Sequence, residues 1–187
     1  AVPVLVAPGA LRKRGMRFGL YYSGGLDWTF FHTPISNFGD MFACVPIGED
    51  YRAYAKAQVR ELVERYKPSV LWNDIAWPDK RDLDEVFSHY YAHVPDGVVN
   101  DRWMGESALF QALKEPMALA GFNAAVKAKL AETDGEAHSP ATTHHDFRTV
   151  EYARGEGLGD VKWESVRVLG MAFGYNANEE VGDYLDG

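Results

Sequence analysis

Apolar residues along the chain follow two alternating patterns. Short apolar runs that end in glycine or charged residues occur at 16–23, 69–74 and 98–103, and they predict buried strands. Between them, segments 51–66 and 83–93 carry apolar residues every three or four positions, which predicts amphipathic helices. Strands that alternate with helices through short connections predict an α/β fold with parallel strands and outer helices.

The two helices are expected to bury one face each. Asp50 is the expected N-cap of the first helix, and Pro68 marks its end because the residue before a proline disfavours helical geometry. The apolar face of the first helix consists of Ala55, Val59, Leu62, Val63 and Tyr66. The second helix is expected to pack through Leu83, Val86, Phe87 and Tyr90.

Three segments depart from this rhythm. Residues 24–48 form a long predicted loop, and a loop of that length in a compact domain is usually functional or disordered. Residues 104–141 are alanine-rich, are broken at Pro116 and end in a polar stretch, which predicts a helical insertion of two short helices and a linker. The segment 160–176 adds one more strand or helix.

Composition excludes several classes of protein. A chain of 187 residues, 47% of them apolar, is long enough for one domain with a core, so we treat 1–187 as a single domain. The net charge of -8 argues against a nucleic-acid partner, since phosphate binding needs a clustered positive face. No apolar run is long enough to cross a bilayer, so no membrane partner is expected. The single cysteine, Cys44, fits a reducing, cytoplasmic location.

Charged residues end two of the predicted strands, and this is where chemistry collects in parallel α/β folds. Asp74 stands between Trp72 and Trp77, although a carboxylate is costly to remove from water without a partner. Arg102, at the end of the next strand, could keep it ionised. An aspartate in this position is also a common helix cap, so the pattern alone leaves both roles open.

Acid/base or glycosyl chemistry needs a second carboxylate. Glu151 and Glu164 are the candidates, and each could equally be an ordinary surface glutamate. His144 and His145 point to opposite faces if they lie in a strand, and no further ligand stands at a telling spacing. We therefore predict no metal site and no cofactor; a glycine-rich phosphate loop is also missing.

Five motifs in order give the chain a specific resemblance: RFGLYYSGGLDW, QVRELVERYKPSVLWNDIAWP, VVNDRW, HHDFRTVEY and KWESVRVLGMAFGYN. Together they resemble the α-L-fucosidases of glycoside hydrolase family 29. The resemblance implies a TIM-type (β/α)8 barrel. The family's His-Trp-Gly and His-His-Asp-Gly-Phe motifs do not occur here, so the chain is expected to hold about half of that barrel. We expect a truncated barrel that a second copy would complete, as a homo-oligomer with the helices at 106–131 in the interface.

The resemblance also assigns roles. Asp74 matches the family's nucleophile and Glu151 its general acid/base, which implies a retaining double displacement on a fucosylated glycan or an aryl fucoside. The family pocket maps onto Tyr21, Trp72, Arg102 and Phe173, and we add Trp28 and Trp77 as residues that line its mouth. The aromatic rings would hold the apolar side of the sugar. The alternatives are a non-catalytic carbohydrate-binding remnant and a structural fragment without a ligand.

Overall fold

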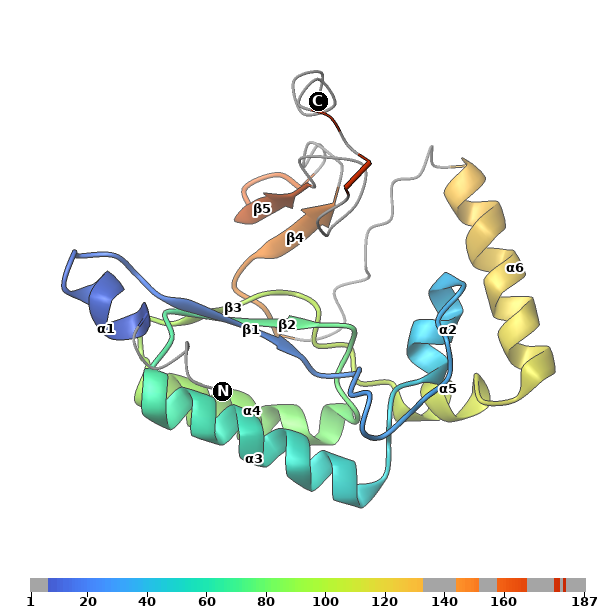
Figure 1. Ribbon diagram of the computed structural model, residues 1–187, viewed down its shortest axis with the longest axis horizontal. Helices are drawn as coiled ribbons and strands as arrows, with labels where there is room; N and C mark the ends of the chain where they lie inside the picture. The colour runs from blue at the N-terminus through green and yellow to red at the C-terminus, as the bar shows by residue number, and fades with distance from the viewer. Residues whose placement is uncertain (1–6, 133–143, 152–157, 168–176, 179, 181–187) are drawn as a thin grey trace.

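A computed structural model describes most of the chain (Figure 1). It covers residues 7–132, 144–151, 158–167, 177–178 and 180. A three-stranded parallel sheet has the order β1-β2-β3. Its strands are β1 (Gly19–Ser23), β2 (Val70–Asp74) and β3 (Val98–Val99). The parallel strands confirm the predicted α/β class, while the half barrel stays a prediction.

Two long helices cover one face of this sheet (Figure 1). They are α3 (Glu49–Tyr66) and α4 (Leu83–His93), and a short 3₁₀ turn, η2 (Lys80–Asp82), leads into α4. Helix α3 begins one residue before the predicted cap, with Gly48 as its N-cap, so the prediction for Asp50 is wrong. It ends at Tyr66, and its C-cap Lys67, with a φ of 43°, turns the chain toward β2.

The main core lies between the helices and the sheet, as the periodicity predicts. On α4 all four predicted apolar positions are buried. On α3 the buried residues are Tyr51, Ala55, Val59 and Val63, while Leu62 and Tyr66 are half-buried. Leu71 and Val99 enter the same cluster from the strands, and Trp77 and Trp103 enter it from the loops that follow them. Burying these large side chains is the dominant favourable contribution to folding.

A second, two-stranded parallel sheet lies apart from the first in Figure 1. It consists of β4 (Arg148–Glu151) and β5 (Trp163–Val166), so the described part of the predicted segment 160–176 contains a strand, and 168–176 lie outside the described residues. Asp146 joins it to β3: its backbone N–H donates to the Val99 carbonyl at 2.9 Å, and its carboxylate accepts from the Val99 N–H at 2.7 Å. Asp146, two residues before β4, therefore links the last strand of the first sheet to the second sheet.

Four further helices lie at the two sides of the three-stranded sheet (Figure 1). They are α1 (Ala7–Arg12), α2 (Phe38–Ala43), α5 (Ser107–Ala112) and α6 (Pro116–Glu132). Helix α2 falls inside the predicted loop 24–48, which is therefore not wholly irregular. The two helices predicted on either side of Pro116 are present as α5 and α6, and Pro116 is the first residue of α6, a position where its missing N–H has no cost. Within the described residues, no helix has both the length and the apolar character needed to cross a membrane.

The turn after β1 packs against the turn after β2 so closely that only glycine fits. A Cβ on Gly25 would lie 1.8 Å from the Ile75 carbonyl oxygen, whereas a Cβ on Gly121 in α6 would meet nothing within 4 Å. We expect Gly25→Ala to lower the free energy of unfolding by about 1–3 kcal/mol or more, because a backbone carbonyl cannot move aside cheaply. Gly121→Ala, the matched control, should stabilise α6 by roughly 0.5–1 kcal/mol. Urea unfolding of both variants would measure this, and equal midpoints would contradict it.

Candidate active site

The first carboxylate of the site lies where β2 ends. β2 pairs in register with β1, so that Asp74 faces Ser23. The chain then turns sharply through Ile75 and Ala76, whose φ angles of 55° and 72° are unusual for residues that carry a side chain. The Ile75 N–H donates to Asp74 Oδ1 at 2.9 Å, which fixes the carboxylate at this turn. Such backbone strain clusters at functional sites.

Two buried asparagines hold the strand ends in place. The Asn100 side-chain oxygen accepts from the Asn73 N–H at 3.0 Å, and its amide donates to the Asn73 carbonyl at 2.8 Å. The Asn73 side chain in turn accepts from the Gly24 N–H and donates to the carbonyls of Ala76 and Arg102. Both asparagines are fully buried with every polar side-chain atom bonded, an arrangement that makes a polar network rigid.

Arg102 joins two carboxylates that come from different sheets. Its Nη1 donates to Asp74 Oδ1 at 2.9 Å, and its Nη2 donates to Glu151 Oε1 at 2.6 Å. The side chains of Asp74 and Arg102 are only 19% and 18% exposed, and that of Glu151 is 35% exposed. Because the groups are partly desolvated, these pairs are stronger than ion pairs on an open surface.

The charge of Arg102 is stabilised by its surroundings. Burial opposes the charge, but the hydrogen bonds to Glu151 and Asp74 outweigh it and raise the pKa of the guanidinium. The guanidinium carbon also lies 5.1 Å from the centre of the Trp72 ring, within cation–π range. Arg102 is therefore a fixed positive charge between the two carboxyl groups.

Tyr21 contacts the other oxygen of the aspartate. Its hydroxyl donates to Asp74 Oδ2 at 2.8 Å, and its ring stacks on Trp72 with the centroids 5.3 Å apart. Burial, together with the hydrogen bond to the Asp74 carboxylate, raises the pKa of Tyr21, so the phenol remains a proton donor. Oδ1 thus accepts two hydrogen bonds and Oδ2 accepts one, which leaves Oδ2 the freer oxygen.

The second sheet is tied to the first at the same edge. Arg148 Nε donates to the buried carboxylate of Asp101 at 2.6 Å, and the Thr149 N–H donates to its other oxygen at 3.0 Å. These bonds set the direction of β4 and hence the place of Glu151, two residues further on. Glu164 on β5 accepts from Thr149 Oγ1 at 3.0 Å and from the Trp72 indole N–H.

Among the residues predicted from the sequence, one group lies together: Tyr21, Trp72, Asp74, Arg102 and Glu151. Trp28 is 61% exposed and its ring lies against Phe31, with the centroids 4.8 Å apart. Phe173 lies outside the described residues.

The prediction that Trp77 lines the mouth of a pocket is wrong. Its side chain is fully buried and lies in the main core, where its ring centroid is 5.5 Å from that of Trp103. The left-handed turn at Ile75 and Ala76 reverses the chain after β2, so Trp77 points back into the core rather than toward Asp74. The buried ring offers no surface to a sugar.

Sequence reasoning missed the residues that support the site: Asn73, Asn100, Asp101, Arg148 and Thr149. A signal for some of them is present, because one Asn-Asp dipeptide ends β2 and another directly follows β3. The carboxyl ends of neighbouring parallel strands meet at one edge, so two polar pairs at equivalent positions indicate a shared network.

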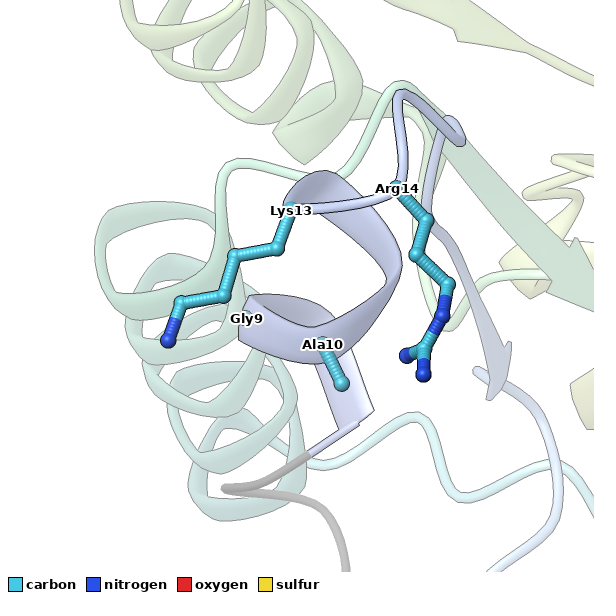
Figure 2. A pocket seen from close by; sticks show the side chains of 4 residues that line it. All are labelled: Gly9, Ala10, Lys13 and Arg14. Atoms are coloured by element: carbon cyan, nitrogen blue, oxygen red, sulfur yellow. The ribbon is translucent and has the colours of Figure 1, made fainter.

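A surface hollow beside α1 is unrelated to this site. Gly9, Ala10, Lys13 and Arg14 line it (Figure 2), and none of the clustered carboxylates does. It is open, and α1 has only six residues. The site is therefore defined by the strand ends and not by this hollow.

Among the comparisons with known proteins, a family model described as alpha-L-fucosidase matches residues 7–186 and thereby shows the family of this chain. This chain belongs to the α-L-fucosidase family. The tissue α-L-fucosidase of Bos taurus is 31% identical over 103 residues, which cover 50% of this chain and 20% of the bovine protein. Fucosidases are glycoside hydrolases, and this confirms the family recognised from the five motifs.

Solved fucosidase structures match almost the whole chain. The Thermotoga maritima α-L-fucosynthase in complex with alpha-L-Fuc-(1-2)-beta-L-Fuc-N3 is 37% identical with a TM-score of 0.69, over 98% of this chain and 33% of that one. The T. maritima α-fucosidase in complex with fucose is 37% identical with a TM-score of 0.65, and the match covers 94% of this chain and 32% of that one. This member of the fucosidase family thus spans about a third of those chains.

Proposed function

We propose that the chain carries the catalytic centre of a retaining α-L-fucosidase, with Asp74 as nucleophile and Glu151 as general acid/base. The observation that supports this most is the bridge from Asp74 through Arg102 to Glu151. It holds two carboxylates, from two sheets, beside one another at the carboxyl edge of parallel strands. Family membership supplies the reaction class and the sugar.

In the first step, Asp74 Oδ2 attacks the anomeric carbon of the fucoside. The bond from that carbon to the leaving oxygen breaks as the new bond to Oδ2 forms, and Glu151 gives its proton to the leaving oxygen. Oδ2 is the attacking atom because Oδ1 is already engaged by Arg102 and by the Ile75 N–H. The Tyr21 hydroxyl positions Oδ2.

In the second step, water releases the sugar. Glu151 is now a carboxylate and takes a proton from the water. The water oxygen attacks the anomeric carbon at the same time, and Asp74 leaves as a carboxylate. Two inversions give net retention, for which the carboxyl groups must come within about 5–5.5 Å of each other. The Arg102 charge favours the departing carboxylate.

The stacked rings of Tyr21 and Trp72 provide a place for the sugar. Tyr21 contacts Asp74 through its hydroxyl, and Trp72, two residues before Asp74 in β2, lies against the Arg102 guanidinium that binds Asp74. Aromatic faces suit the apolar side of a sugar ring, including the 6-methyl group of fucose. The homo-oligomer that would complete the barrel stays a prediction.

The test is turnover of 4-nitrophenyl α-L-fucoside by the purified chain. We expect release of nitrophenol from the α-fucoside and none from 4-nitrophenyl β-L-fucoside, since attack by Asp74 from one face serves one anomer. Fucose binding without turnover, measured by calorimetry at high protein concentration, would overturn the catalytic proposal and leave a carbohydrate-binding domain. If the chain neither binds fucose nor turns over the fucoside, the catalytic proposal and the carbohydrate-binding alternative are both wrong.

A further inference from the structure

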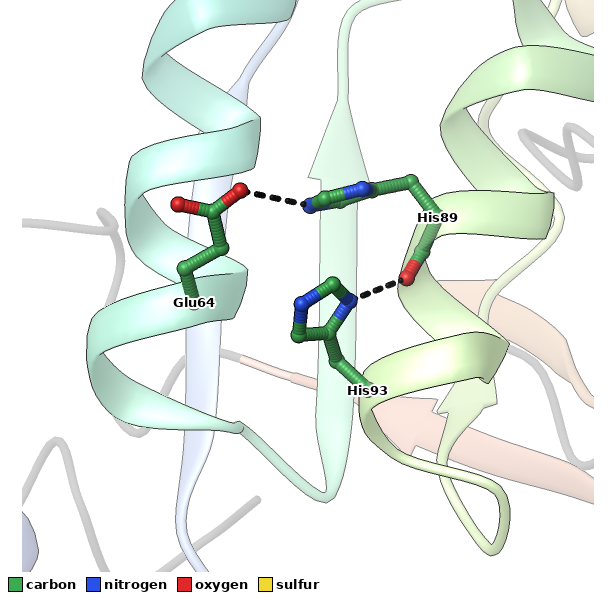
Figure 3. A group of neighbouring side chains, drawn as sticks. All are labelled: Glu64, His89 and His93. Atoms are coloured by element: carbon green, nitrogen blue, oxygen red, sulfur yellow. Dashed lines mark hydrogen bonds and ion pairs between the residues drawn. The ribbon is translucent and has the colours of Figure 1, made fainter.

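A second cluster of chemically capable side chains lies between α3 and α4, as Figure 3 shows. Glu64 projects from the end of α3, and His89 and His93 project from the last two turns of α4. Both helices end just before the strands that follow them begin, so the cluster lies at the opposite end of the sheet from Asp74. It is thus separate from the candidate active site.

The distances in this cluster suit a small metal ion. His89 Nε2 lies 3.3 Å from Glu64 Oε1, and one ligand atom from each of the three residues lies within 4.8 Å of the others. A tetrahedral zinc ion with bonds of 2.0–2.2 Å separates its ligands by about 3.3 Å. The first pair already has that spacing, and the ligand atom of His93 lies within 4.8 Å of both. Within the described part of the chain, it is the one group of three such residues.

The histidines are also in the chemical state that a metal needs. His93 Nδ1 lies 2.9 Å from the His89 carbonyl oxygen, which can only accept, so Nδ1 carries the proton and Nε2 keeps its lone pair. The Nε2 atom of His89 is buried and makes no hydrogen bond. Burial and the neighbouring His93 lower the pKa of His89.

Charged residues nearby do not replace a metal as partner. Arg60 is hydrogen-bonded to Glu85 at 2.6 Å, and Lys56 is also paired with Glu85 at 3.2 Å, so these groups are engaged with each other. Glu64 faces His89, and among the ion pairs of the described residues no lysine or arginine is paired with Glu64. An imidazole and a carboxylate that face one another are both good zinc ligands.

We propose that Glu64, His89 and His93 bind one zinc ion that links α3 to α4, with water as the fourth ligand. Two histidines one helical turn apart present their rings on the same face, and the glutamate completes a three-ligand set from the facing helix. A metal that joins two helices of the main core stabilises the folded chain by binding to it and not to the unfolded state. The sequence alone predicted no metal site.

The experiment titrates Zn²⁺ and Co²⁺ into chelator-treated, dialysed protein. We expect one equivalent of Zn²⁺ by calorimetry, a tetrahedral Co²⁺ absorption spectrum, and a higher Tm with Zn²⁺ but not with Mg²⁺. His93→Gln should weaken Zn²⁺ binding at least tenfold, which removes the Tm shift at a fixed metal concentration, while fucoside turnover is unchanged. His144→Gln is the matched control, because His144 lies 3.9 Å from Asp146 in the other His-carboxylate pair.

Each outcome decides the proposal. Binding by the parent chain and by His144→Gln, together with loss in His93→Gln, supports it. Absence of Zn²⁺ binding by the parent chain, equal binding by His93→Gln, or loss only in His144→Gln would overturn it. Should His93→Gln unfold, Glu64→Gln offers a second variant on the other helix, with the same expected loss of binding.

Discussion

Asp74→Asn should lower turnover of 4-nitrophenyl α-L-fucoside by on the order of 10⁴-fold, as expected when a catalytic nucleophile is removed. Asparagine keeps an oxygen that can accept from Arg102 and from the Ile75 N–H, so the turn is preserved. It lacks the negative charge needed to form and then release the glycosyl ester. Initial rates at saturating substrate, with circular dichroism as a check on folding, would measure the effect.

A matched control separates the loss of the nucleophile from the loss of a charge. Asp84 is an exposed aspartate on α4, and Asp84→Asn should leave turnover unchanged. Residual activity in Asp74→Asn within tenfold of the parent chain would mean that another group attacks the sugar. Equal losses in the two variants would point to net charge rather than to the site.

Glu151→Ala should lower turnover by about 10²–10⁴-fold on a substrate with a poor leaving group, such as methyl α-L-fucoside. The loss in the first step should be much smaller on 4-nitrophenyl α-L-fucoside, because nitrophenolate leaves without a proton. The second step then becomes slow for lack of a base. Azide needs no base, so added azide should restore turnover and give fucosyl azide. Rates on both substrates, with and without azide, would measure this.

Glu164 is the rival for this role. It accepts from Thr149 Oγ1 and from the Trp72 indole, and glutamine would still accept both bonds. We expect Glu164→Gln to lower both rates by a similar, modest factor and to show no response to azide. The reverse pattern, with azide rescue in Glu164→Gln and none in Glu151→Ala, would assign the proton transfer to Glu164 instead.

Helices α3 and α4 and the end of β2 could be predicted because short-range periodicity determines them, whereas β3 ends at Val99, short of the predicted 98–103. The four apolar positions of α4 are one helical face in the sequence and one buried face in the structure. Asp74 and Arg102 could be placed at one edge because parallel strands bring their carboxyl ends together. The motif resemblance added Glu151, which no periodicity links to that edge.

Features that depend on long-range contacts could not be predicted. Trp77 follows Asp74 by three residues, but the positive φ angles of the turn send it into the core. The break between the two sheets depends on where Asp146 meets β3. Glu64 and the pair His89 and His93 lie 25 or more positions apart on two helices, so their meeting appears only when α3 packs on α4.

The measurement that tests the account most directly is covalent trapping of the nucleophile. The chain would be incubated with 2-deoxy-2-fluoro-α-L-fucosyl fluoride, whose fluorine slows release of the glycosyl-enzyme more than its formation. Mass spectrometry of the intact chain and of its peptides would then locate the label. We predict one fluorofucosyl group per chain, on Asp74. A label on another residue, or turnover that releases 2-deoxy-2-fluoro-β-L-fucose as the first product without any adduct, would contradict the account.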